Sequence, residues 1–213
     1  MILTTIYRGL AVVVSVCISS ASEPFCRKED VHSCPGEREK NREVPMNNFR
    51  PPTPRPELVV FDVDFTLWPF WVDTHVSPPF KKTSDGRVVD RHNYVIKGYE
   101  DVPEILEWMS RQGYTMAVAS RTDAEQDMRK ALKLLDWDKY FTYKEIYPGS
   151  KTRHFARFHE QSGIPYSKMI FFDDEERNIY DLNRIGVLSL QVDRGLTLEV
   201  LQNGLEKFAR ERK

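Results

Sequence analysis

Cysteine is scarce in this chain of 213 residues, and its three copies, Cys17, Cys26 and Cys34, all lie near the start. The remainder of the sequence therefore offers no thiol nucleophile, no thiolate ligand for a metal and no disulfide framework. This absence excludes the phosphatases and proteases that depend on a catalytic cysteine.

An excess of charge of either sign is also missing. The 31 Lys and Arg residues nearly balance the 32 Asp and Glu residues, which leaves a formal net charge of −1. Without a strong electrostatic field, we expect no nucleic-acid partner and no attraction to an acidic membrane surface. The sequence contains no internal repeat or low-complexity tract, and its length indicates one ordinary domain with some additional chain.

A hydrophobic run long enough to cross a bilayer is the third absence. The apolar stretch 10–18 follows Arg8 and contains Ser15, and it is shorter than the roughly 20 residues of a spanning helix. We therefore expect no membrane span. Two interpretations of residues 1–22 stay open: a secretory signal peptide that ends in small residues, or an extension that is not used.

Residues 23–56 are polar and charged, and they end in the proline-rich stretch Arg50 to Pro56. We interpret this segment as a linker. Met46 would begin a shorter chain of one-domain size. The folded domain is expected to comprise residues 57–213.

Short apolar runs alternate with amphipathic helical patterns from Leu58 onward. Strands are predicted at 58–61, 116–119, 143–147, 169–172 and 187–192, and helices at 101–112, 123–135, 151–162 and 196–210. The alternation predicts an α/β fold with a doubly wound, mainly parallel sheet and helices on both faces. Ligand sites in such sheets lie beyond the carboxyl ends of the strands.

Polar clusters follow the predicted strands directly, so they should gather at that edge of the sheet. They are Asp62 and Asp64, Ser120 and Arg121, Lys151, and Asp173 with Asp174. Several carboxylates in a small space repel one another, and a hard divalent cation relieves the repulsion. Oxygen ligands without histidine or cysteine favour Mg²⁺ over zinc. A hydroxyl and two cations nearby suit a phosphate group, so the clusters indicate phosphoryl chemistry.

Simpler interpretations exist for the acidic residues. Asp62 and Asp64 could lie in a solvated loop after a strand. Asp123 is most simply a helix cap or an acid in the first turn. Glu175 and Glu176 are the kind of residue that the dipole of a helix favours at its start, and we assign them that role.

The basic residues and histidines also divide between functional and simpler structural interpretations. Lys151 begins a predicted helix, where a cation opposes the helix dipole, so its position indicates a nearby phosphate or carboxylate. His154 and His159 are five residues apart and share no helix face, so we expect structural or exposed positions for both. The role of His75 stays open.

The order of these motifs resembles that of the haloacid dehalogenase (HAD) phosphatase superfamily. The shared pattern is Asp62-x-Asp64-x-Thr66 after a strand, a serine after the next main strand, a downstream lysine and a paired Asp-Asp. More narrowly, the chain from about Glu57 onward resembles the magnesium-dependent phosphatase 1 family. The segments that carry this likeness are DFTLWPFWVDTHV at 64–76, PPF at 78–80, ASRT at 119–122, EIYPGSK at 145–151 and FFDDE at 171–175.

The resemblance implies roles for the four aspartates. Asp62 would be the nucleophile that forms an aspartyl-phosphate, and Asp64 would be the general acid and base. The Asp62 side chain, the Asp64 backbone carbonyl and Asp174 would hold Mg²⁺. Asp173 would support the site.

Phosphate binding is implied for three further residues. Ser120 and Arg121 would hold phosphoryl oxygens, and Lys151 would offset the charge on Asp62 and on the transferring group. Thr66 would brace the catalytic loop.

The insertion after the first motif predicts a small flap. Residues 81–89 form the pattern of a β-hairpin that turns at Asp85-Gly86. Superfamily members that shield the site use an inserted cap domain, and we expect no large cap domain here. The site should therefore be open, with Trp68, Phe70 and Trp71 divided between the core and the substrate entrance.

The resemblance implies a magnesium-dependent phosphomonoester hydrolase that acts on protein phosphotyrosine, on sugar phosphates such as fructosamine phosphates, or on both. Two alternatives stay open: a protein phosphoserine phosphatase of the C-terminal-domain phosphatase type, and a non-catalytic phosphate-binding protein. The family likeness implies a cytoplasmic location, whereas a signal peptide at 1–22 would direct the protein to the secretory pathway.

Overall fold

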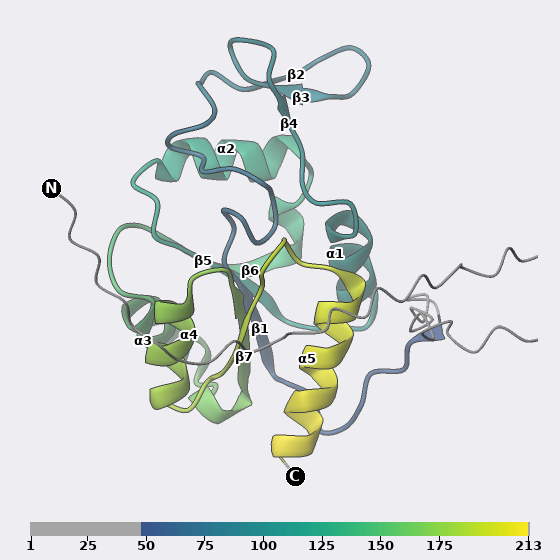
Figure 1. Ribbon diagram of the computed structural model, residues 1–213, viewed down its shortest axis with the longest axis vertical. Coiled ribbons are helices and arrows are strands. Elements are labelled where there is room, and N and C mark those ends of the chain that lie inside the picture. The colour runs from purple at the N-terminus through teal and green to yellow at the C-terminus, as the bar shows by residue number, and fades with distance from the viewer. Residues whose placement is uncertain (1–47, 213) are drawn as a thin grey trace, which may run out of the picture. The chain divides into compact units, whose positions relative to one another are not determined.

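The computed structural model describes residues 48–212, which Figure 1 shows as a coloured ribbon. The three cysteines, the two interpretations of residues 1–22 and most of the expected linker therefore lie outside the described residues. In the described part of the chain, no helix is both long enough and apolar enough to cross a membrane.

Five parallel strands form the central sheet, in the spatial order β6-β5-β1-β7-β8. They are β1 (Leu58–Phe61), β5 (Met116–Ser120), β6 (Phe141–Ile146), β7 (Met169–Asp173) and β8 (Leu188–Gln191). All four residues of the central strand β1 are buried, as expected for a strand covered on both faces. The α/β fold with a parallel sheet is confirmed.

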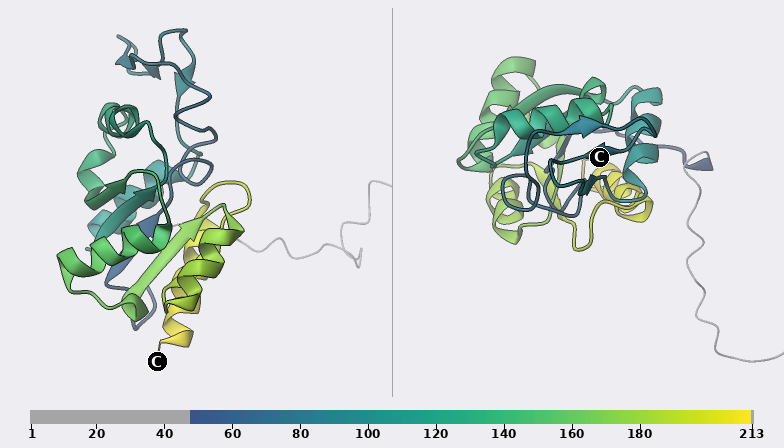
Figure 2. Two further views of the ribbon diagram at one scale, coloured as in Figure 1. Left: turned by 90° about the vertical axis from the view of Figure 1, so that its left-hand side faces the viewer. Right: turned by 90° about the horizontal axis from the view of Figure 1, so that it is seen from above.

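Helices cover both faces of this sheet, as the two views of Figure 2 show. They are α1 (Val102–Arg111), α2 (Glu125–Leu134), α3 (Lys151–Ser162), α4 (Glu176–Arg184) and α5 (Leu198–Glu211), with short 3-10 helices at Asp138–Tyr140 and Tyr166–Lys168. Successive side chains of a strand point to opposite faces of the sheet. Val59 and Phe61 therefore enter one core with α1, α2 and α5, whereas Leu58 and Val60 enter another with α3 and α4.

One helix start differs from the sequence interpretation. Helix α2 has Ala124 as its N-cap, so the assignment of Asp123 as a cap or first-turn acid was wrong. The Thr122 hydroxyl accepts the Ala124 N–H at 3.2 Å instead. At the start of α1, the Asp101 carboxylate makes no cap to its own helix and accepts the backbone N–H of Leu198 at 2.9 Å. This bond ties α5 to α1.

The flap is a separate antiparallel sheet of three strands, drawn above α2 in Figure 1. Its strands are β2 (Lys81–Lys82), β3 (Val88–Val89) and β4 (Val95–Ile96). Gly86 has a φ of 85°, which glycine adopts without strain, so the expected turn is present. The expectation of a two-stranded hairpin missed β4, because two residues are too few to show a strand pattern.

A buried carboxylate holds the flap together. Asp90 accepts the backbone N–H groups of Ser77, His92 and Tyr94 at 3.0, 2.8 and 2.8 Å. Although burial opposes the charge, these donors hold the pKa of Asp90 below its usual range.

The described end of the expected linker packs against the domain. The Phe49 ring lies 5.6 Å from that of Trp108. The Arg55 guanidinium lies 4.0 Å from the centre of the Tyr114 ring and donates to the carbonyl of Gln112 at 2.8 Å. Residues 48–56 therefore run along the start of the domain and the end of α1.

Candidate active site

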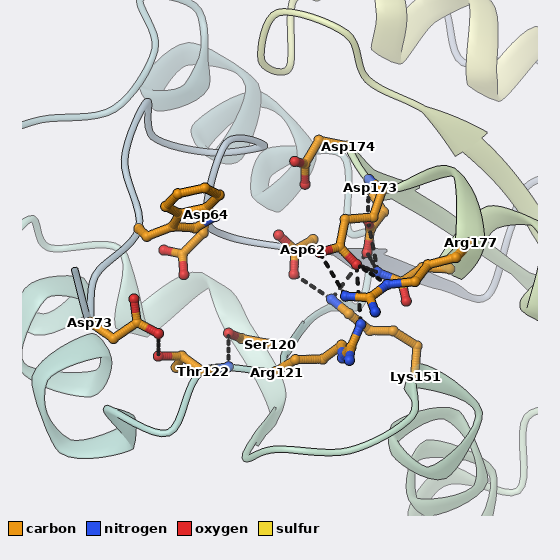
Figure 3. A pocket seen from close by; sticks show the side chains of 13 residues that line it. Asp62, Asp64, Asp73, Ser120, Arg121, Thr122, Lys151, Asp173, Asp174 and Arg177 are labelled. Carbon is orange, nitrogen blue, oxygen red and sulfur yellow. Dashed lines mark hydrogen bonds and ion pairs between the residues drawn. The ribbon is translucent and has the colours of Figure 1, made fainter. Parts of the chain in front are cut away.

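A cavity of about 220 Å³ opens at the carboxyl ends of the central strands, and Figure 3 shows its lining. Seven of the residues expected at the site line it: Asp62, Asp64, Ser120, Arg121, Lys151, Asp173 and Asp174. They come from the ends of β1, β5 and β7 and from the first residue of α3. The structure thus brings these residues together as expected, with Thr66 outside the lining.

Lys151 is a buried cation at the centre of the cluster, with only 2% of its surface exposed. Its ammonium group donates to the Asp62 carboxylate and to the Ala119 carbonyl, and it lies 3.1 Å from Asp173 Oδ2. Although burial favours the neutral amine, the two carboxylates raise the pKa of Lys151 above its usual range. Lys151 therefore joins the ends of β1, β5 and β7.

Asp62 directly follows β1 and is buried. Its backbone N–H donates to the Phe172 carbonyl at 2.9 Å, which fixes its position beside β7. Burial raises the pKa of Asp62 well above its usual range, while Lys151 acts in the opposite direction. Figure 3 shows the carboxylate directed into the cavity beside Lys151.

Asp64 is oriented by two donors from its own loop. Its Oδ1 accepts the indole N–H of Trp68 at 2.6 Å and the backbone N–H of Val72 at 3.3 Å. Phe65, the next residue, has a left-handed φ of 56°, which turns the chain sharply after Asp64. Burial raises the pKa of Asp64 to about 7, although both hydrogen bonds favour the carboxylate. A group with such a pKa can donate and accept a proton near neutrality.

Ser120 is the last residue of β5, Arg121 follows it, and both line the same cavity. The Ser120 hydroxyl is buried and accepts the backbone N–H of Thr122 at 3.2 Å. The Arg121 guanidinium donates through Nη1 to Glu175 Oε2 at 3.1 Å. Arg121 therefore has an acidic partner within the lining.

The paired aspartates after β7 occupy different environments. Asp173 is fully buried, and its carboxylate accepts from Asn178 Nδ2 at 3.0 and 3.1 Å and from the Glu175 N–H at 2.7 Å. Asp174 is half-buried, and its carboxylate points into the cavity in Figure 3. Burial, with a smaller effect of Asp173, raises the pKa of Asp174 to about 6. Asp174 is thus the better placed of the two to bind a cation.

Thr66 lies outside the cavity lining and is fully buried. Its carbonyl accepts the Leu196 N–H at 2.9 Å, which ties the loop to the segment before α5. Its hydroxyl has no hydrogen-bond partner among residues 48–212. The observed bracing contact is therefore made by the backbone of Thr66.

Five lining residues were missing from the expected site: Asp73, Thr122, Glu175, Arg177 and Asn178. Glu175 does precede α4, as its assignment to a helix start implied, but its carboxylate also binds Arg121 and Arg177. The sequence positions of Arg177 and Asn178 could have indicated their place in the site, because both lie within one helical turn of Asp174.

The aromatic segment divides between core and entrance. Trp68 is buried and stacks on Phe70, with ring centres 5.0 Å apart. Trp71 lines the cavity with 50% of its surface exposed, and it stacks on His75 with ring centres 5.2 Å apart. His75 Nδ1 also accepts the Trp71 backbone N–H at 3.0 Å, so His75 supports the ring at the entrance.

The charge of the lining fits a bound divalent cation. Six carboxylates face three basic side chains, and burial raises the pKa values of Asp62, Asp64 and Asp174. Among residues 48–212, no three His, Cys, Asp or Glu side chains are arranged as a metal-binding group. A set of two carboxylates and one backbone carbonyl does not require such a group, and all-oxygen ligands suit Mg²⁺.

Comparisons of the sequence with known proteins relate this chain to phosphatases and to a HAD-like hydrolase. A family profile described as acid phosphatase matches residues 54–211. Human magnesium-dependent phosphatase 1 is 50% identical over 155 residues, which cover 73% of this chain and 88% of that protein. A HAD-like hydrolase superfamily protein of Schizosaccharomyces pombe is 41% identical over 157 residues, covering 68% of this chain and 91% of that protein.

Among solved structures, the N-terminal part of a Bacteroides fragilis protein, containing a phosphatase domain complexed with Mg, aligns with a TM-score of 0.49 and 16% identity. The alignment covers 71% of this chain and 39% of that one. From the family profile and the two sequence relatives, the chain belongs to the acid phosphatase family and, within the HAD superfamily, to the magnesium-dependent phosphatase 1 family.

Proposed function

We propose that this protein is a magnesium-dependent phosphomonoester hydrolase that works through an aspartyl-phosphate on Asp62. One observation carries the proposal. A buried carboxylate held by Lys151 shares a small cavity with Asp64, whose pKa is raised to about 7. A nucleophile and a proton donor therefore lie together beside groups that can bind phosphate.

The cation would be held by the side chains of Asp62 and Asp174 and by the backbone carbonyl of Asp64. When bound, Mg²⁺ supplies positive charge that lets a phosphate dianion approach a carboxylate. The excess of carboxylates in the lining supports this assignment. The name of the human relative, magnesium-dependent phosphatase 1, is consistent with it.

In the first step, an oxygen of Asp62 forms a bond to phosphorus as the bond from phosphorus to the ester oxygen breaks. Asp64 gives its proton to the departing oxygen, so the product leaves as a neutral alcohol. Ser120, Arg121 and Lys151 provide one hydroxyl and two cationic groups that stabilise the charge on the phosphoryl oxygens.

In the second step, Asp64 is a carboxylate and takes a proton from the attacking water. The water oxygen bonds to phosphorus, the bond from phosphorus to the Asp62 oxygen breaks, and inorganic phosphate is released. Asp64 returns to its protonated form and Asp62 to its carboxylate. Asp64 thus donates a proton in the first step and accepts one in the second, and a pKa of about 7 suits both tasks.

The proposed substrates are protein phosphotyrosine, sugar phosphates such as fructosamine phosphates, or both. The small flap supports this proposal, since only short strands accompany the site where other superfamily members carry a cap domain. The exposed ring of Trp71 at the entrance offers an apolar surface to a leaving group.

The test is hydrolysis of p-nitrophenyl phosphate by the full chain, with Mg²⁺ and after chelation. We expect turnover that requires Mg²⁺ and falls by roughly 10⁴-fold or more in Asp62→Asn, as for the loss of a catalytic nucleophile. The control is Asp123→Asn, an exposed aspartate outside the cavity lining. A folded wild-type protein without turnover of any phosphomonoester would contradict the proposal.

Reductive trapping tests the intermediate separately. Borohydride added during turnover should convert an acyl phosphate on Asp62 to homoserine, which mass spectrometry of the peptide would identify. A panel of phosphotyrosine peptide, phosphoserine peptide and fructosamine phosphate then ranks the substrates by kcat/KM. Preference for the phosphoserine peptide would favour the C-terminal-domain type of activity instead.

A further inference from the structure

Glu175 makes an unusual set of contacts for an acidic residue in a phosphate pocket. Its carboxylate accepts from Arg177 Nε at 2.7 Å and Nη2 at 3.0 Å, which is a two-pronged ion pair. The oxygen that accepts from Arg177 Nε, Oε2, also accepts from Arg121 Nη1 at 3.1 Å and from Asn178 Nδ2 at 3.1 Å. Glu175 thus connects two arginines that both line the cavity.

Electrostatics alone would not favour this placement. The lining already holds five other carboxylates, and each added negative charge repels an incoming phosphate. The contacts of Glu175 must therefore provide something that offsets the repulsion.

Arg121 is the side chain that the contact of Glu175 fixes in place. An arginine side chain is long and loses conformational freedom when it binds a ligand, unless it is already fixed. The bond from Nη1 to Glu175 fixes one side of the guanidinium. Its buried Nε has no hydrogen-bond partner among residues 48–212, and the side chain lines the cavity.

We propose that Glu175, braced by Arg177, is a positioning residue that holds the Arg121 guanidinium in place for phosphate binding. The inference rests on the proposed function, in which Arg121 binds phosphoryl oxygens. Glu175 acts through Arg121 and does not touch the reacting atoms. Arg177 acts one step further away by fixing the carboxylate of Glu175.

The neighbouring Glu176 provides a matched control. It has the same charge and lies at the start of the same helix, but it is exposed and outside the cavity lining. Glu175→Ala and Glu176→Ala therefore remove the same charge from the same turn. Only the first removes the contact to Arg121.

The first measurement is the Kd of inorganic phosphate for the full chain, by calorimetry in the presence of Mg²⁺. We expect Glu175→Ala to weaken binding about 5- to 10-fold, in the range of one ordinary hydrogen bond because the phosphate contact of Arg121 is loosened and not removed, with no change in Glu176→Ala. Glu175→Gln, which keeps an acceptor for Arg121, should restore part of the affinity. Tighter phosphate binding in Glu175→Ala would overturn the proposal, because it would show that Glu175 acts only by repulsion.

Coupling to Arg121 is the second measurement. In an Arg121→Ala background, Glu175→Ala should weaken phosphate binding no further, because the group that it positions is absent. If Glu175→Ala weakens phosphate binding by the same factor with and without Arg121, the proposal is overturned. Thermal unfolding of each variant checks the fold. If Glu175→Ala does not fold, Arg177→Met replaces it, because Arg177 has an exposed side chain. Arg177→Met should also weaken phosphate binding, but by a smaller factor.

Measurements of turnover distinguish a failure of this inference from a failure of the proposed function. Glu175→Ala should raise KM for p-nitrophenyl phosphate about as much as it raises the Kd of phosphate, with a smaller effect on kcat. A wild-type protein that neither binds phosphate nor hydrolyses the ester would refute the proposed function itself. A wild-type protein that does both, with no effect of Glu175→Ala, would refute only the role of Glu175.

Discussion

Trp68 donates its indole N–H to the Asp64 carboxylate at 2.6 Å from within the aromatic core. The donor cannot move freely, because the indole stacks on Phe70 on one side and lies 6.4 Å from the ring of Trp137. The orientation of the proposed general acid is therefore set by core packing.

Trp68→Phe tests this relationship. The variant keeps an aromatic ring in the stack but removes the donor, so we expect kcat to fall about 10-fold, less than the roughly 10²- to 10⁴-fold of a whole acid–base contribution because Asp64 itself remains. The lost bond also favoured the charged form of Asp64, so its pKa should rise and the alkaline limb of the pH–rate profile should move to higher pH. Trp137→Phe is the control, and an equal effect of both variants would point to packing alone.

Lys151→Met should leave buried carboxylates without their cation. We expect a loss of about 3–5 kcal/mol in the free energy of unfolding at pH 7, as for other broken buried ion pairs. Asp62, whose pKa burial already raises, would lose the cation that lowers it and would bind a proton as pH falls. The destabilisation should therefore be smaller at pH 5 than at pH 7, as measured by urea unfolding.

The control for that change is Lys168→Met, at an exposed lysine that pairs with Glu57. Ion pairs at the protein surface contribute little to stability, so we expect the free energy of unfolding to change by less than about 1 kcal/mol. Equal destabilisation by both variants would show that the burial of Lys151 has no energetic consequence.

His154 should make the fold sensitive to mild acid. It is fully buried, and burial lowers its pKa to about 4. The unfolded chain, with an ordinary histidine, binds the proton more readily, so stability falls as pH drops from about 6.5 toward 4. We expect this group to account for a loss of about 2 kcal/mol between pH 7 and pH 5.

His154→Gln should remove that part of the pH dependence, which chemical unfolding at several pH values would measure. His159→Gln, at an exposed position on the same helix, is the matched control. An unchanged slope in His154→Gln would show that His154 is not the responsible group.

Asp90→Ala should loosen the flap while leaving the central sheet intact. The change leaves the N–H groups of Ser77, His92 and Tyr94 without their acceptor, at a cost of about 1–3 kcal/mol for each group that stays buried. Hydrogen exchange of the flap amides should accelerate, while that of β1 and β7 should not. Faster exchange throughout the domain would show that the flap and the sheet unfold together.

Strand ends were the most predictable part of the site. The apolar run at 58–61 and the polar residues after it indicate both a buried strand and an edge where ligands bind, which is why Asp62 and Lys151 could be expected to meet. Glu175 and Arg177 could not be placed in this way. Their contacts depend on how the first turn of α4 packs beside Arg121, and a helix that starts with acids looks the same whether or not it faces a cavity.

Short elements were equally hard to foresee. Each flap strand has two residues, too few for a periodic pattern, and the Asp90 carboxylate that accepts three backbone N–H groups beside these strands has no sequence signature. The Asp123 assignment failed for a related reason. The Thr122 side chain offers the same kind of acceptor one residue earlier, and the sequence alone does not say which of the two is used.

The bond from the Leu196 N–H to the Thr66 carbonyl links the catalytic loop to a part of the chain that is made much later. During synthesis, Asp62 and Asp64 leave the ribosome long before Leu196 does. A nascent chain therefore carries the proposed nucleophile and proton donor while the loop that follows them still lacks its anchor. We therefore expect phosphatase activity to appear only after the segment that carries Leu196 has emerged and bound the loop.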